Sequence, residues 1–147
     1  MANDNHLLSV TCYNVTMINN SKYYNEFFEL GQQKINFNFM ELSLLDDDPV
    51  YTLKKVMKEM DFSYLLAKYS NKRRNEFNPI MKYGVLIYAA MCGVKAVDRI
   101  VELCEREIAF IWLMQGEKPQ RDTFYDFINN KLTGDILDNL NYQFLCR

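Results

Sequence analysis

The chain has 147 residues, of which 49% are hydrophobic, and a formal net charge of −2. A chain of this length and composition can bury one hydrophobic core, so a single domain with an appendage is expected. The slightly acidic balance is unusual for a free-standing nucleic-acid binder, and the single histidine, His6, excludes a histidine-based metal site and a Ser-His-Asp triad.

Charge is distributed unevenly along the chain. Residues 1–50 contain two lysines and seven acidic residues, a net charge of −5, whereas residues 68–94 contain five basic residues and one acidic residue, a net charge of +4. Lys72, Arg73 and Arg74 form the densest part of the basic segment. They can neutralise DNA phosphates, and the alternative is a solvated loop between two helices.

No signal peptide or membrane-spanning segment is expected. The longest apolar run, 85–92, is far shorter than the roughly 20 residues that cross a bilayer. The cysteines have no metal or redox spacing, and Cys92 and Cys104 lie in apolar segments, where buried reduced thiols are expected. The pattern predicts a cytoplasmic protein with no membrane partner and no bound cofactor.

Residues 1–45 are expected to form an N-terminal arm that is partly disordered. The first twenty residues are polar and rich in asparagine, with a weak strand signal at 9–17. A short helix is expected at 21–31, with its aromatic residues on one face. At 34–42, apolar and polar residues alternate with the period of a strand, which must pack on the helices or pair with another chain.

Residues 46–134 are expected to form the helical domain. Three aspartates before Pro49 predict a helix start, because exposed backbone N–H groups attract negative charge and proline is tolerated at the first position. A metal site is the weaker alternative, since contiguous side chains on a helix lead point in different directions. Asn78 and Pro79 predict a second start, and Gly93 predicts the end of that helix.

The segment between Asn78 and Gly93 is apolar on nearly every side, which is typical of a helix at the centre of a bundle. The following segment, 94–116, is amphipathic, with charged residues at four-residue spacing on its solvent face. Its pattern becomes apolar on more sides near Glu107, and a bend or break is expected there.

The stretch GEKPQRDTFYDFINNKLTG, residues 116–134, predicts a short helix with Asp122 as N-cap and Gly134 as its end. The residues expected to face inward are Phe124, Phe127, Ile128 and Leu132, and those expected to face outward are Arg121, Tyr125, Asp126, Asn129 and Asn130. A short amphipathic helix after a proline turn has the form of the second half of a helix-turn-helix, and arginine and asparagine can read guanine and adenine edges. The alternative is the last packing helix of a bundle.

From Leu44 to Leu132 the chain resembles the N-terminal domain of bacterial insertion-sequence DDE transposases of the InsH type. The resemblance rests on many short matches that occur in the same order. They are Asp61-Phe62-Ser63, Asn78-Pro79, Tyr88-Ala89, Gly93-Val94, Arg99-Ile100, Cys104, Ile108-Ala109-Phe110, Trp112-Leu113, and Pro119 with Thr123 and Phe127.

The resemblance implies a helical domain that helps to bind the terminal inverted repeats of a mobile element. In such transposases a following RNase H-like domain holds three carboxylates and two divalent metal ions, which activate water and then a 3′-OH. Residues 135–147 are expected to begin a helix that leads to this domain, which is absent from the chain. The chain is therefore expected to bind DNA without cutting it.

The expected fold is an all-α small helical bundle with a helix-turn-helix-like end and an extended, partly disordered N-terminal arm. The candidate DNA-binding residues are Lys72, Arg73, Arg74, Lys118, Arg121, Thr123, Tyr125, Asn129 and Asn130. The expected partners are the terminal repeats and either a second copy of the chain or the full-length transposase. A protein-interaction module, which dimerises or inhibits transposition, is the alternative function.

Overall fold

The computed structural model describes residues 22–30, 44–69 and 77–146. Three expectations fall outside these ranges: the weak strand at 9–17, the alternating segment at 34–42, and the placement of Lys72, Arg73 and Arg74. The described elements are α2 (Lys22–Asn25), the π-helical turn η1 (Glu26–Leu30), α4 (Pro49–Lys58), α5 (Ser63–Leu66), α6 (Pro79–Met91), α7 (Val97–Arg106), α8 (Ile108–Leu113), α9 (Arg121–Asp126), the π-helical turn η3 (Phe127–Lys131) and α10 (Gly134–Leu145). All regular elements in these ranges are helical, which confirms the expected all-α bundle.

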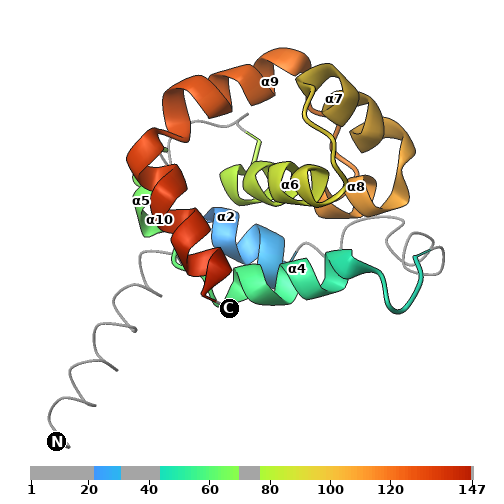
Figure 1. The fold of residues 1–147 in the computed structure, drawn as a ribbon, viewed down its shortest axis with the longest axis horizontal. Coiled ribbons are helices and arrows are strands. Elements are labelled where there is room, and N and C mark those ends of the chain that lie inside the picture. Colours follow the sequence, from blue (N-terminus) through green and yellow to red (C-terminus); the bar gives the residue numbers. More distant parts are fainter. Residues whose placement is uncertain (1–21, 31–43, 70–76, 147) are drawn as a thin grey trace, which may run out of the picture.

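Helix α6 is the centre of the bundle. Figure 1 shows it inside a ring formed by α4, α7, α8, α9 and α10, and it packs directly against α2, α4, α7 and α8. Ile80, Met81 and Tyr83 are fully buried, as the apolar sequence of this segment predicts. A Cβ atom at Gly84 would lie 3.0 Å from Met57 Cε, so the missing side chain permits the close approach of α4 and α6.

The sequence predicts two helix starts from a polar capping residue followed by proline, and the structure confirms both. Asp48 Oδ1 and Asn78 Oδ1 each accept a hydrogen bond of 2.9 Å from the backbone N–H two residues further on, at the starts of α4 and α6. These bonds satisfy N–H groups that have no partner within the helix. Proline, which has no N–H group, loses no hydrogen bond at the first helical position.

The predicted end at Gly93 and the predicted break near Glu107 are also confirmed. Gly93 has a φ of 77°, and the N–H of Val94 donates to the Ala89 carbonyl at 2.8 Å, which is the bond of a Schellman cap. At Glu107 the backbone is extended, and it separates α7 from α8. Cys104 is buried as expected, but the expectation for Cys92 is wrong: it is exposed, because α6 ends at Met91 and the chain leaves the core there.

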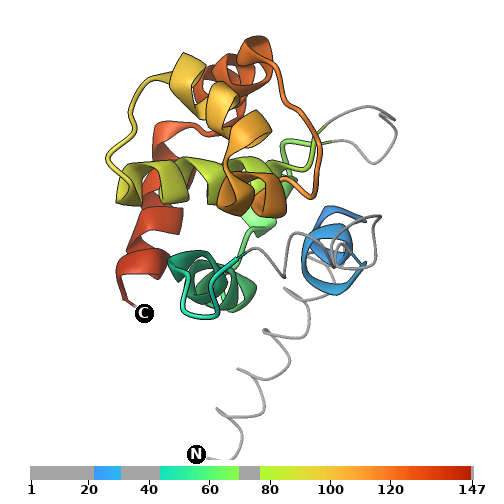
Figure 2. The ribbon, with the colours of Figure 1, turned by 90° about the vertical axis from the view of Figure 1, so that its right-hand side faces the viewer.

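The helix at 22–30 is part of the same core. Tyr23, Phe27 and Phe28 are buried in the hydrophobic cluster of the bundle, and Figure 2 shows their helix beside the start of α6. Asn78 Nδ2 donates to the Tyr23 carbonyl at 2.6 Å, which joins the two elements. The aromatic residues of this helix, which the sequence places in the N-terminal arm, thus contribute to the core of the bundle.

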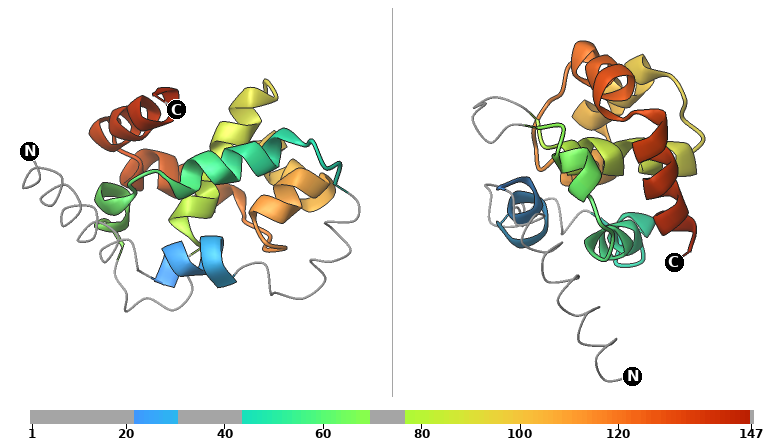
Figure 3. Two further views of the ribbon diagram at one scale, coloured as in Figure 1. Left: turned by 90° about the horizontal axis from the view of Figure 1, so that it is seen from below. Right: turned by 90° about the vertical axis from the view of Figure 1, so that its left-hand side faces the viewer.

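Helix α10 packs on the bundle beside the turn that links α4 and α5 (Figure 3). Ile136 and Leu140 enter the core. The Gln143 side-chain amide accepts from the Asp61 N–H at 2.7 Å and donates to the Asp61 carbonyl at 3.0 Å. These two hydrogen bonds, to the backbone N–H and C=O of the same residue, hold the end of the helix in a defined position.

Candidate nucleic-acid interface

The candidate helix begins at Arg121, with its N-cap two residues earlier than the sequence predicts. Gln120 occupies the N-cap position without a side-chain hydrogen bond, and Asp122 lies in the first turn. The expectation of Asp122 as N-cap is therefore wrong, although a carboxylate in the first turn still interacts favourably with the helix dipole. Gly134 is the first residue of α10 and does not end the candidate helix, which ends at Lys131 with Leu132 as its C-cap.

The second half of this helix is a π turn. The Leu132 N–H donates to the carbonyl of Phe127, five residues earlier, at 2.7 Å. Phe124, Phe127 and Leu132 are buried as predicted, but Ile128 is 36% exposed. The prediction for Ile128 assumed α-helical spacing; the extra residue in a π turn rotates this side chain away from the face that Phe124 and Phe127 share.

The structure brings four of the candidate residues together on the outer side of α9 and η3. Arg121, Asn129 and Asn130 are exposed, and Tyr125 is 39% exposed. Thr123 is half-buried, with its N–H donating to the Gln120 carbonyl at 3.0 Å. These side chains come from one helical run of 121–131.

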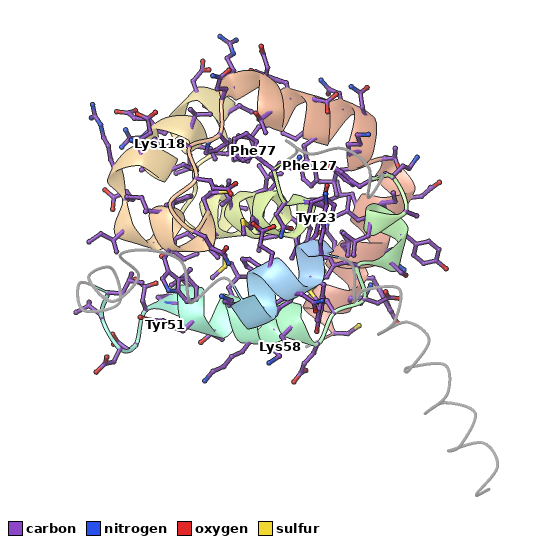
Figure 4. All side chains as sticks on the ribbon, turned by 180° about the vertical axis from the view of Figure 1, so that it is seen from behind. Tyr23, Tyr51, Lys58, Phe77, Lys118 and Phe127 are labelled. Atoms are coloured by element: carbon purple, nitrogen blue, oxygen red, sulfur yellow. The ribbon has the colours of Figure 1, made fainter. Side chains whose placement is uncertain are left out.

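Lys118 lies near the start of this run. It is exposed on the connection between α8 and α9, and Figure 4 shows it at the edge of the molecule. The same figure shows Phe127 in the interior, where its ring is one wall of the core. The run 118–131 therefore has one face fixed by packing and one face that carries polar and basic groups.

Electrostatic contacts within the chain hold two of the candidate residues. Arg121 Nε lies 3.2 Å from Asp98 Oδ1 of α7, and the guanidinium lies 5.3 Å from the centroid of the Tyr125 ring. A hydrogen bond to Tyr125 and the charge of Asp98 raise the pKa of Arg121 above its ordinary value. Asn130 Nδ2 donates to Asp126 Oδ1 at 2.7 Å.

Lys131 connects the end of the candidate helix to the flank of the basic segment. Its Nζ donates to the Lys68 carbonyl at 3.3 Å and lies 5.0 Å from the centroid of the Tyr69 ring. Lys131 is not among the residues that the sequence pattern marks as candidates. Its position in the last turn of a helix, where cations are favoured, is the signal that could have found it.

A pocket of about 510 Å³ lies elsewhere, between residues 44–48, the end of α6, and α7 with α8. Tyr88 donates to Asp48 Oδ1 at 3.1 Å across it, and burial followed by the charge of Asp48 raises the pKa of Tyr88. Of the two arginines that line the pocket, both form ion pairs with Glu102, at 2.7 and 2.9 Å. The pocket is thus separate from the candidate helix, and its two arginines share one carboxylate.

The described ranges contain no group of three or more His, Cys, Asp or Glu residues placed to hold a metal ion. Within the same ranges, no helix combines the length and the apolar character that crossing a membrane requires.

Comparison with known proteins gives one family. The family model described as Transposase domain (DUF772) matches residues 21–130, most of the chain. The match begins at the helix that completes the core and ends within η3, so it covers the candidate interface. No curated protein and no solved structure gives a significant match.

Proposed function

Since the chain belongs to the transposase-domain family, we propose that it serves DNA transposition as a module that binds the ends of an insertion sequence. The observation that carries this proposal is the helical run 121–131. Its packing face is fully buried, and its outer face presents an arginine, a tyrosine and two asparagines. Arginine and asparagine are the side chains that form bidentate contacts with guanine and adenine.

The contact between Lys131 and Lys68 supports a single binding surface. Lys68 is the first residue of the basic segment, and its carbonyl accepts from Lys131 at the end of the candidate helix. In our proposal Lys72, Arg73, Arg74 and Lys118 contact phosphates, whereas Arg121, Tyr125, Asn129 and Asn130 enter a groove and Thr123 supports the helix start. The terminal inverted repeats are the proposed ligand.

Base reading and phosphate contact are separable by mutation. Arg121→Ala or Asn129→Ala should weaken binding to a terminal-repeat duplex by about 1–3 kcal/mol per lost base contact, while binding to scrambled DNA stays almost unchanged. Replacing Lys72, Arg73 and Arg74 by alanine should weaken binding to every sequence. It should also reduce the slope of log K against log salt by roughly 0.9 per lost phosphate contact.

Fluorescence anisotropy with labelled duplexes at several salt concentrations measures both effects. Phe124→Ala is the folding control, because this buried residue should affect stability and not selectivity. If Arg121→Ala and Asn129→Ala fold normally and bind both duplexes like the parent chain, the helix is only a packing element and the base-reading role is lost.

We also propose that the chain does not itself cut or join DNA. In the transposases that it resembles, the metal-binding carboxylates belong to a separate domain that follows the helical one. Incubation of the purified chain with DNA carrying the element ends and Mg²⁺ or Mn²⁺ should yield no nicked product. Nicking that disappears when acidic residues of this chain are replaced by their amides would contradict this proposal.

A protein-interaction module is the second candidate function. Tyr142 and Leu145 on α10 are 70% and 82% exposed, and exposed apolar side chains are frequent at protein interfaces. The small negative net charge also favours a protein partner over DNA. Sedimentation velocity of the parent chain and of a Tyr142→Ser/Leu145→Ser variant tests this function: a dimer that the double variant lacks would support it.

A further inference from the structure

Arg121 is held from two sides by residues of different elements. Asp98 lies in the first turn of α7, and its Oδ1 is 3.2 Å from Arg121 Nε. Tyr125, one turn further along α9, has its ring centroid 5.3 Å from the guanidinium carbon. The contact with Asp98 therefore fixes the direction of the guanidinium relative to the bundle, and not only relative to its own helix.

Folding stability does not account for this arrangement. The side chains of Arg121 and Asp98 are 61% and 67% exposed, and exposed ion pairs contribute little to the free energy of unfolding. The geometry of the Arg121–Asp98 ion pair explains the arrangement better. An ion pair through Nε aligns the guanidinium plane, and the two Nη groups at its end are the pair that binds guanine O6 and N7 in a bidentate contact.

We propose that Asp98 is a positioning residue that determines sequence selectivity, by orienting Arg121 toward a guanine and by opposing its attraction to phosphates. The inference rests on the proposed DNA-binding function. Attraction to phosphates acts on DNA of any sequence, so a carboxylate beside the arginine lowers non-specific affinity. An oriented guanidinium gains binding energy only at a site where a guanine is in place. The same carboxylate therefore preserves the affinity for the specific sequence.

The test compares Asp98→Asn with Glu105→Gln. Each variant removes one negative charge from the exposed surface of α7, but Glu105 has no contact with Arg121 among those that the described residues form. In Asp98→Asn the affinity for scrambled DNA should rise, and the ratio of specific to scrambled affinity should fall about fivefold or more, as expected for one disordered base contact. Glu105→Gln should change both affinities by the same factor.

A double variant tests whether Asp98 acts through Arg121. Once Arg121 is alanine, adding Asp98→Asn should leave the selectivity ratio where Arg121→Ala alone places it, because coupled residues are not additive. A further loss of selectivity in the double variant would mean that Asp98 acts through another group, and it would overturn the proposal.

A measurement without DNA separates this inference from the proposed function. Relaxation of the Arg121 ¹⁵Nε–H group should show an ordered side chain in the parent chain and in Glu105→Gln, and a mobile one in Asp98→Asn. Equal order in all three proteins overturns the positioning role, as does an unchanged selectivity ratio in Asp98→Asn when the parent chain discriminates. A parent chain that does not discriminate between the duplexes overturns the proposed function itself, whatever the relaxation shows.

Discussion

Gln115 adopts a backbone conformation that side chains other than glycine rarely take. Its φ is 53°, at the end of α8, where the Gly116 N–H donates to the Ile111 carbonyl at 2.9 Å and closes the helix. The buried side chain supplies a reason for a non-glycine residue here. Gln115 Nε2 donates to the Glu26 carbonyl at 3.1 Å, and its Oε1 has no hydrogen-bond partner among the described residues.

A pair of substitutions separates the strain from the hydrogen bond at this position. Gln115→Ala and Gln115→Gly both lose the amide, but only alanine keeps a Cβ atom in the left-handed region. We expect Gln115→Gly to be more stable than Gln115→Ala by about 1 kcal/mol, with both less stable than the parent chain. Urea unfolding measures the difference, and an alanine variant as stable as the glycine variant would contradict the strain argument.

Burial of Cys104 makes folding sensitive to alkaline pH. Burial, with a smaller effect of the Glu105 charge, raises the pKa of the Cys104 thiol to about 12, above the unfolded value of about 8.5. Between these two values the unfolded chain loses the proton and the folded chain keeps it. The stabilising contribution is complete below the unfolded pKa and is lost as the pH rises toward the folded pKa.

The free energy of unfolding should therefore fall by up to about 1.4 kcal/mol per pH unit for this thiol above pH 9. Cys104→Ala should start from a lower stability and lose less of it between pH 8 and 11. Tyr83, whose pKa burial raises to about 12, contributes to the remaining slope from pH 10 upward in both proteins. Equal slopes in urea unfolding of the two proteins would exclude the thiol as the cause.

Among the elements, those with local signals could be predicted from the sequence. The starts of α4 and α6 depend on a side chain that caps a backbone group two residues away, so the pairs Asp48-Pro49 and Asn78-Pro79 are sufficient to locate them. The extended backbone at Glu107 follows a change in the hydrophobic pattern. Each of these signals lies within a few residues of the feature that it predicts.

The remaining features depend on distant residues, which a local pattern does not contain. The side chain of Gln115 holds a helix that lies 89 residues earlier, and the π turn at 127–131 follows from the need to bury both Phe127 and Leu132. The same limit applies to the candidate site. The outward position of Arg121 could be predicted from its helix, but its partner Asp98 belongs to another element.

Besides the apolar contacts of Ile136 and Leu140, the docking of α10 uses the side chain of Gln143, whose contribution can be tested. Gln143→Ala removes both hydrogen bonds to the backbone N–H and C=O of Asp61, and we expect it to cost about 1–3 kcal/mol, at 0.5–1.5 kcal/mol per bond. The Asp61 amide should then exchange its hydrogen faster. Tyr142→Ala, at an exposed position of the same helix, should change neither quantity. Unaltered exchange at Asp61 in Gln143→Ala would show that the apolar contacts of α10 suffice.

At the scale of the whole molecule, one hydrophobic cluster connects Tyr23 near the start of the described chain with Leu140 in the last helix. Trp112, the single tryptophan, lies within it, with its ring 5.2 Å from that of Tyr51 and 4.6 Å from Lys54 Nζ. Lys54 Nζ also lies 4.8 Å from the Phe27 ring, so this group of residues spans three helical segments.

A single core predicts a single unfolding transition. The emission of Trp112 should have a maximum typical of a buried indole, and its change in urea should coincide with the loss of far-UV circular dichroism. Trp112→Ala should cost about 3–5 kcal/mol, a large fraction of the stability of a domain of this size. Separate midpoints for the two signals, or an emission maximum of a water-exposed indole in the folded chain, would contradict the single core.

The hydrogen bond from Gln115 to the helix at 22–30 also has a consequence for folding during synthesis. The ribosome releases the chain from its N-terminus at about 5–20 residues per second, so the 89 residues between Glu26 and Gln115 take about 4–18 s to appear. Throughout that time the aromatic face of Tyr23, Phe27 and Phe28 has no completed core to enter. A nascent chain halted before Gln115 should bind a chaperone that recognises exposed aromatic segments, and release from it should coincide with emergence of Gln115.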